Sequence, residues 1–196
     1  MSNESVKNTF SLLVITLVAG LLLGFVYQIT KEPIAKEQQR AKEEAYKEVF
    51  AEADSFAELP LNGEITKEFK KNGWDAVIDE AMGVYDKDKN PIGYVLTVTD
   101  HEGYGGDIQF AMGVKSDGTL NGISFLSLSE TAGLGMKAKD EKFKEQFSDK
   151  KVENFQYTKN GAASENEIDA ISGATITTNA VTNGVNAGLY YIGVLE

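Results

Sequence analysis

Residues 169–178 (DAISGATITT) combine small residues with several hydroxyl groups just before an apolar C-terminal stretch. Ser172 is suited to cap a helix that starts here, which would place Thr175 in its first turn. The first turn has free N–H groups and the positive end of the helix dipole, and both favour a phosphate. Gly173 and Ala174 leave room for a bulky group, so the Thr175 hydroxyl could carry a phosphoester. A plain capped helix with nothing attached is the alternative.

Two glycine-rich segments lie upstream and could form loops that bind a ligand. Residues 129–135 (SETAGLG) can present several backbone N–H groups to an anion. Residues 101–106 (HEGYGG) place the ring of Tyr104 among three glycines, which permit close approach of the backbone. His101 in this segment could donate a proton near a redox centre. Ordinary glycine loops, with a solvated histidine, are the alternative for both segments.

Composition excludes several kinds of chemistry. The 196 residues include no cysteine, which rules out disulfides, iron–sulfur clusters and thiolate-bound metals. The single histidine, His101, cannot form a multi-histidine metal site, and we assign neither metal ligands nor catalytic residues. The net charge of −11, without a basic stripe, argues against nucleic-acid binding. Any redox centre must therefore be an organic cofactor held by oxygen atoms and backbone groups, or be absent.

An uninterrupted apolar run near the N-terminus predicts a membrane span. Residues 10–29 contain no charged side chain and are long enough to cross a bilayer as a helix. We therefore expect a tail over residues 1–9 and a transmembrane helix over residues 10–30. A cleaved signal peptide is the alternative, but the run ends in bulky residues rather than small ones. Gly20 and Gly24 could let a second helix approach closely, although glycine is also common in membrane helices.

The charges that flank the span leave its orientation open. Basic residues are more frequent after the span than before it, which by the positive-inside rule would keep the following domain in the cytoplasm. Acidic residues are interleaved with them, however, and long domains cross the membrane largely irrespective of charge.

The rest of the chain predicts an α+β domain. Residues 31–73 are expected to form a helical stalk, with alternating charges over residues 36–50, and then a polar linker. Apolar C-terminal residues at helical spacing predict a helix over residues 174–194. The fold class is an antiparallel β-meander packed with this C-terminal helix, on a single N-terminal transmembrane helix, and residues 74–196 form the cofactor-binding domain. Strands are expected over residues 77–85, 92–99, 107–115 and 120–128, and a short helix over residues 140–147.

Taken together, the motifs resemble the family of FMN-binding domains over roughly residues 74–196. The segment from Asp169 to Thr175 resembles the family's flavinylation signal, Asp-x-x-Ser/Thr-Gly-Ala-Thr, in which a flavin transferase joins FMN to the final threonine. Residues 129–135 are similar to the family's Glu-Thr-Pro-Gly-Leu-Gly loop, with Ala132 in place of the proline, and residues 104–108 to its Tyr-Gly-Gly-x-Ile segment. The resemblance implies covalent FMN on Thr175, which physical reasoning alone permits but does not require.

The resemblance also implies the roles of other residues near the cofactor. The transferase would read Asp169, Ser172, Gly173 and Ala174. The residues that would line the flavin or its phosphate are Glu130, Thr131, Gly133, Leu134, Gly135 and Tyr104.

Within this family, the single span and the short total length most resemble the G subunits of Rnf ion-translocating ferredoxin:NAD oxidoreductases. That implies electron relay through FMN, partner membrane subunits including one with a second covalent FMN, and a flavin domain on the extracytoplasmic side of the bacterial cell membrane. The C subunits of sodium-pumping NADH:quinone oxidoreductases are the near alternative, although they are usually longer. A stand-alone membrane-anchored flavin reductase and a non-redox anchor protein are the alternatives from other classes.

Overall fold

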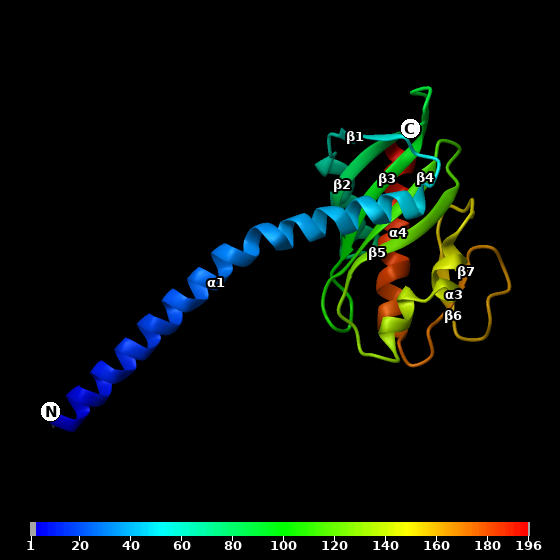
Figure 1. Ribbon diagram of the computed structural model, residues 1–196. Coiled ribbons are helices and arrows are strands. Elements are labelled where there is room, and N and C mark those ends of the chain that lie inside the picture. The colour runs from blue at the N-terminus through cyan, green and yellow to red at the C-terminus, as the bar shows by residue number, and fades with distance from the viewer. Residues whose placement is uncertain (1–2, 196) are drawn as a thin grey trace. The chain divides into compact units, whose positions relative to one another are not determined.

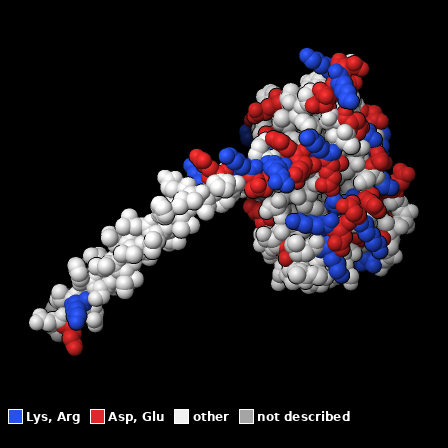
Figure 2. Space-filling view, viewed as in Figure 1, with Lys and Arg blue, Asp and Glu red and all other residues white. Residues whose placement is uncertain are grey.

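A computed structural model of the chain describes residues 3–195, which divide between Ala41 and Lys42 into two units (Figure 1). The described residues of the first unit, 3–41, are all helical and belong to α1 (Asn3–Val49). Residues 8–30 of α1 carry no charged side chain, and Figure 2 shows the corresponding white stretch of surface. The helix is long and apolar enough to cross a membrane, and Pro33 lies inside it without ending it. The predicted membrane span is therefore helical throughout.

The second unit contains a sheet of five antiparallel strands whose spatial order follows the chain. This is the predicted β-meander, with one further strand at its edge. The strands are β1 (Ser55–Leu59), β2 (Ala76–Tyr85), β3 (Pro91–Asp100), β4 (Ile108–Lys115) and β5 (Leu120–Leu128). Because successive side chains of a strand point to opposite faces, β3 directs Leu96 and Val98 to one buried face and Val95 to the other.

The C-terminal helix α4 (Thr175–Leu195) packs on the first of these faces, as the sequence predicts (Figure 1). Two glycines of α4 allow it to lie very close to β4. A Cβ atom on Gly184 would lie 2.9 Å from the ring of Phe110, and one on Gly188 would lie 2.1 Å from the sulfur of Met112. The close packing fixes the position of α4 against the sheet, and with it the position of Thr175.

The opposite face of the sheet is covered by the last two turns of α1, which belong to the second unit (Figure 1). Tyr46 is buried there, and its hydroxyl donates a hydrogen bond of 2.5 Å to Glu80 and lies 2.7 Å from the Thr97 hydroxyl. Lys42 forms an ion pair with the same Glu80. Glu48 accepts hydrogen bonds from Ser124 on β5, at 2.6 Å, and from Lys144, at 2.5 Å. Apolar contacts and buried polar contacts therefore both hold this part of α1 on the sheet.

The stretch over residues 51–73, expected to be a polar linker, is instead part of the fold. It forms β1, which pairs with β2, then α2 (Gly63–Phe69) and the short helix η1 (Lys70–Asn72). Ile65 and Phe69 are buried, and the ring of Phe69 contacts Trp74 and Tyr190. A few buried anchors hold this stretch in place although most of its side chains are exposed.

The segment between β5 and α4 consists of short elements. The helix predicted over residues 140–147 occurs as α3 (Glu141–Lys144) followed by η3 (Glu145–Phe147). The others are η2 (Gly135–Lys139) and two parallel strands, β6 (Gln156–Thr158) and β7 (Glu167–Asp169), which were not predicted from the sequence.

Candidate cofactor site

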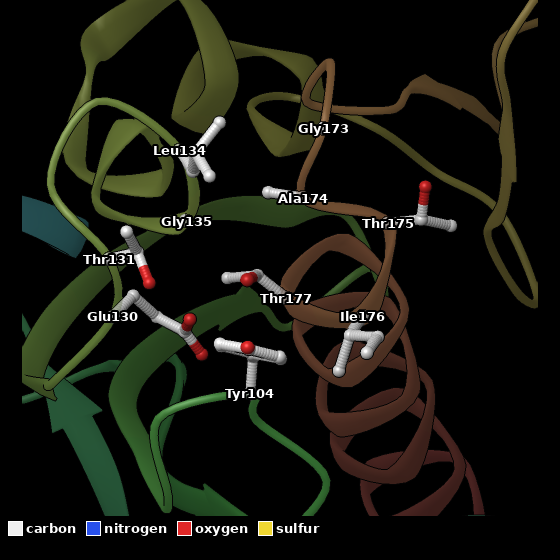
Figure 3. A pocket seen from close by; sticks show the side chains of 10 residues that line it. All are labelled: Tyr104, Glu130, Thr131, Leu134, Gly135, Gly173, Ala174, Thr175, Ile176 and Thr177. Atoms are coloured by element: carbon white, nitrogen blue, oxygen red, sulfur yellow. The ribbon is translucent and has the colours of Figure 1, made fainter.

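Three loops converge beside the N-terminal end of α4: residues 101–107 after β3, residues 129–135 after β5, and residues 170–174 before α4 (Figure 3). The first two loops touch through Gly105. Its N–H donates a hydrogen bond of 3.3 Å to the Glu130 carboxylate, and a Cβ atom on Gly105 would lie only 1.8 Å from the carbonyl oxygen of Ser129. A side chain at this position would therefore push the two loops apart.

Gly135 and Gly173 bring the second loop against α4 and against the loop before it. A Cβ atom on Gly135 would lie 2.5 Å from the Thr177 hydroxyl and 2.6 Å from a carboxylate oxygen of Glu130. Gly173 has a φ of +77°, in the region that favours glycine, and a Cβ atom there would lie 3.0 Å from Leu134. Both glycines are thus required by close packing, and Gly173 is required by its backbone conformation as well.

An open cavity of about 500 Å³ lies between the three loops (Figure 3). This volume is in the range of cofactor pockets, roughly 300–1,000 Å³. Its rim carries the apolar side chains of Tyr104, Leu134 and Ile176, which are 69%, 41% and 52% exposed. Such a rim suits a flat aromatic ligand, which would cover apolar surface that otherwise faces water. The lining consists of Tyr104, Glu130, Thr131, Leu134, Gly135, Gly173, Ala174, Thr175, Ile176 and Thr177.

Most of the site residues expected from the sequence lie in this lining, and three lie outside it. Gly133, with a φ of +77°, shapes the turn in which the Leu134 N–H donates to the Thr131 carbonyl at 3.1 Å. Asp169 is the last residue of β7, and its carboxylate accepts the N–H of Ala162 at 2.5 Å. Ser172 is exposed in the loop before α4.

The expected capping role of Ser172 is wrong, because α4 begins later than predicted. The helix starts at Thr175, so the capping position falls on Ala174, which has no side-chain acceptor. The Thr178 hydroxyl organises the turn instead. It accepts the N–H of Ile171 at 3.0 Å and donates to the Ala174 carbonyl at 3.0 Å. Thr175 is consequently the first residue of the helix, where backbone N–H groups have no partner within the helix.

Thr175 lies at the edge of the cavity rather than deep inside it. Its side chain is half-buried, and in Figure 3 it points away from Glu130 and Thr131. The side chain of Thr175 is therefore next to the start of α4 and partly exposed to solvent.

Two further residues of the lining, Ile176 and Thr177, were not predicted from the sequence. Ile176 extends an exposed apolar side chain over the rim, and Thr177 is buried against Gly135. The sequence signal that could have identified these two residues is their position directly after Thr175, in the first turn of the predicted helix. An exposed isoleucine at the start of a helix would otherwise be an unfavourable use of apolar surface.

The charge of the lining restricts how a phosphate could be held. Glu130 is its only charged residue, and it has no lysine or arginine. A phosphate at this site would therefore depend on the backbone N–H groups and the dipole of α4. With those donors, an apolar rim and a cavity of this volume, the residues fit a flavin mononucleotide.

His101 lies outside the lining and interacts elsewhere. Its Nδ1 atom is 3.0 Å from the Asp107 carboxylate, and this hydrogen bond raises the pKa of the exposed imidazole. Within residues 3–195, the structure places no three His, Asp or Glu side chains so that they could hold a metal ion together.

Comparison with known protein families identifies the kind of domain that contains this site. The FMN-binding domain family matches residues 103–190, which include the second and third loops and most of the first. The family described as the RnfG N-terminal region matches residues 1–49, which cover α1. The fold is also similar to the crystal structure of Shewanella oneidensis NqrC, with a TM-score of 0.49 and 17% identity over 59% of this chain and 60% of that one.

Full-length relatives narrow the class further. The chain is 34% identical to the G subunit of the ion-translocating oxidoreductase complex of Methanosarcina acetivorans, over 100% of this chain and 98% of the relative. It is 32% identical to the G subunit of the proton-translocating ferredoxin:NAD(+) oxidoreductase complex of Clostridium ljungdahlii, over 90% and 85%. It is also 32% identical to the G subunit of the Na(+)-translocating complex of Acetobacterium woodii, over 91% and 86%. The chain belongs to the family of G subunits of ion-translocating oxidoreductase (Rnf) complexes.

Proposed function

We propose that the chain is an electron-transfer subunit of a membrane-bound ion-translocating ferredoxin:NAD oxidoreductase, and that it carries FMN bonded through its phosphate to Thr175. The observation that carries this proposal is the position of Thr175. It begins α4 and lines a cavity of suitable volume for a flavin, inside the segment that matches FMN-binding domains. The names of the full-length relatives support the role in the complex.

The start of α4 would hold the phosphate. In attachment, the Thr175 oxygen would form a bond to the phosphorus of an activated flavin nucleotide, the phosphorus–oxygen bond to the leaving group would break, and the leaving group would take up the hydroxyl proton. A flavin transferase would perform this step, and the partly exposed position of Thr175 at the edge of the cavity would allow it to reach the hydroxyl. The N–H groups of the first turn then stabilise the negative phosphate oxygens.

The rim residues would position the ring of the flavin. Bound FMN supplies the redox chemistry, and a link through the phosphate leaves its ring chemically unchanged. Tyr104, Leu134 and Ile176 offer apolar surface against which the ring can lie. Glu130 places a negative charge in the cavity, which would make additional negative charge on the ring less favourable. These residues would orient the cofactor and adjust its potential, and no substrate need bind.

Other membrane subunits of the complex are the proposed partners, and one of them carries a second covalent FMN. Electrons would enter the flavin on this chain from one redox centre and leave to the next.

The covalent link can be tested with the full-length chain produced in membranes with and without a flavin transferase. After denaturation and gel electrophoresis, flavin fluorescence is expected in the band only when the transferase is present. The residues after Lys159 include no lysine or arginine, so trypsin releases residues 160–196 as one peptide that should carry the added mass. No fluorescence despite active transferase, or added mass on another peptide, would refute attachment at Thr175. Rapid NADH oxidation by the isolated flavinylated chain would refute the role as a relay.

We further propose that the second unit lies on the extracytoplasmic side of the membrane. The chain has no cysteine, so a single introduced cysteine can report the location of any position. Lys87 lies in the turn between β2 and β3, and Lys87→Cys is expected to react with a membrane-impermeant thiol reagent in intact cells. The matched variant Ser5→Cys, before the span, should react only after the membrane is opened. The reverse pattern would place the second unit in the cytoplasm.

A further inference from the structure

Asp100, the last residue of β3, is a fully buried carboxyl group that the flavin site does not use. One of its oxygens, Oδ1, accepts the N–H of Glu102 at 2.9 Å. The other, Oδ2, is buried and has no hydrogen-bond partner within residues 3–195. A buried carboxylate oxygen without a partner is costly, whereas the protonated acid is neutral and avoids most of that cost.

The surroundings of Asp100 add little that would stabilise a negative charge. Ala76 on β2 and Ile108 on β4 are its neighbours in the sheet, and a Cβ atom on Gly184 of α4 would lie 3.5 Å from its Cβ. Helix α4 has no acidic or basic side chain. The charged groups with the largest effect on Asp100 are Asp75 before β2, and Glu102 and His101 in the following loop. Two more acidic side chains belong to these loops: Asp107, whose carboxylate is 3.0 Å from Nδ1 of His101, and Glu130, which accepts the Gly105 N–H.

These surroundings bring the titration of Asp100 into the neutral range. Burial raises the pKa of Asp100 to about 7, and the negative charges of Glu102 and Asp75 act in the same direction. The hydrogen bond from the Glu102 N–H and the charge of His101 oppose the rise without cancelling it.

Asp100 is also close to the cofactor site in the fold. It directly precedes the loop that presents Tyr104 and Gly105 to the cavity. Gly184, which faces it, is nine residues after Thr175, or about 13 Å along the axis of α4 at about 1.5 Å per residue. The start of α4, which borders the cavity, is thus about two and a half helical turns from the residue that faces Asp100.

We propose that Asp100 is a proton-binding group of this domain, which takes up a proton when negative charge is added to the neighbouring cavity and releases it when that charge leaves. The carboxylate gains one proton from solvent to form an O–H group, and no electron is transferred to it. The source of the charge, a reduced flavin, rests on the proposed function. The burial of Oδ2 and the position of Asp100 directly before the loop of residues 101–107 do not depend on the proposed function.

The expected size of the effect follows from Coulomb's law. A unit charge about 13 Å away, at an effective dielectric constant of about 20, changes a pKa by about one pH unit. Because Asp100 titrates near neutral pH, such a shift changes its average protonation by about half a proton.

The first experiment uses the full-length chain without flavin. The infrared absorption of protonated carboxyl groups is measured between pH 5 and pH 9 for the wild type, for Asp100→Asn and for the matched control Asp107→Asn, an exposed aspartate of the same loop. A band that disappears near pH 7 is expected in the wild type and in Asp107→Asn, and should be absent from Asp100→Asn. If the three proteins have the same spectrum at pH 5, Asp100 is ionised and the proposal fails.

Stability against urea gives a second readout on the same proteins. The folded state holds the proton more tightly than the unfolded chain, in which the pKa of an aspartate is about 3.9. Wild-type stability should therefore fall as the pH rises from about 4 to about 7 and then level off. Asp100→Asn should lack this component and have the higher urea midpoint above pH 7. A lower midpoint for Asp100→Asn above pH 7 would contradict the proposal.

The link to the cavity is tested with and without flavin. In the flavin-free chain, Glu130→Gln removes a negative charge from the cavity and should lower the pH at which the Asp100 band disappears. In the flavinylated chain, the spectrum of the reduced protein minus that of the oxidised protein should show the Asp100 band near pH 7, and Asp100→Asn should remove it. No shift in Glu130→Gln and no redox-linked band would refute the link. If Thr175 carries no flavin, the proposed function fails while the measurements on the flavin-free chain still decide the proton site.

Discussion

Thr175→Ala is expected to eliminate covalent flavin from the chain while leaving the fold intact. The variant removes the oxygen that would bond to the phosphate, and alanine is well tolerated at the first position of a helix. Thr175 makes no hydrogen bond through its side chain within residues 3–195, and the neighbouring turn is organised by Thr178. We therefore expect flavin fluorescence in a denaturing gel to fall to background, with a circular dichroism spectrum and a urea midpoint close to those of the wild type.

Two matched variants separate loss of the attachment oxygen from general damage to the site. Thr175→Ser keeps a hydroxyl at the same position and should retain fluorescence. Thr131→Ala removes a hydroxyl from the opposite wall of the cavity and should also retain covalent flavin. Fluorescence that persists in Thr175→Ala would place the link on another residue. Loss of fluorescence in all three variants would indicate that the substitutions disturb recognition by the transferase.

Gly105→Ala is expected to have the largest effect on stability among substitutions at the site. The added Cβ atom would lie 1.8 Å from the carbonyl oxygen of Ser129, which is a backbone atom and cannot rotate away. Overpacking typically costs about 1–3 kcal/mol, and a clash with backbone belongs at the upper end of that range. We expect the free energy of unfolding in urea to fall by about 3 kcal/mol, as the loops of residues 101–107 and 129–135 move apart.

Gly63→Ala is the control for this prediction. Gly63 is the first residue of α2, and a Cβ atom there would meet nothing within 4 Å. Its replacement should leave stability unchanged or raise it slightly, because alanine favours a helix more than glycine does. Equal stability of Gly105→Ala and Gly63→Ala would show that the two loops are not held together as tightly as the contact between Gly105 and Ser129 implies.

The sheet and the C-terminal helix could be predicted from the sequence because their patterns are local. The strands β2 to β5 are largely apolar runs bounded by turns, and in α4 the apolar residues recur at helical spacing. The edge strand β1 lacks such a signal. Its side chains are mostly exposed, and it is a strand because its backbone pairs with β2. Three-residue strands such as β6 and β7 are likewise defined by pairing rather than by side-chain pattern.

The residues of the site could be predicted from the sequence only where they belong to one short continuous motif. Thr175 and the residues just before it form a continuous segment, which the motif identifies. Thr177 packs against Gly135, and Asp100 faces Gly184. In each pair the two residues are far apart in the sequence, so no local motif marks the contact. The predicted start of α4 was too early because Ser172 is a favourable cap by residue type. The turn is held instead by the hydroxyl of Thr178, inside the helix, which accepts the Ile171 N–H.

The position of the last two turns of α1 determines what part of this chain can fold by itself. The FMN-binding match begins at residue 103, yet Tyr46 and Phe50 are buried against strands that follow them. A fragment that starts at residue 74 would expose Val84, Val95 and Ala111 to water and leave the edge of β2 unpaired. A soluble fragment should therefore begin at or before Lys42. A protease that cuts before Lys42 should release an intact domain, whereas a cut after Phe50 should not.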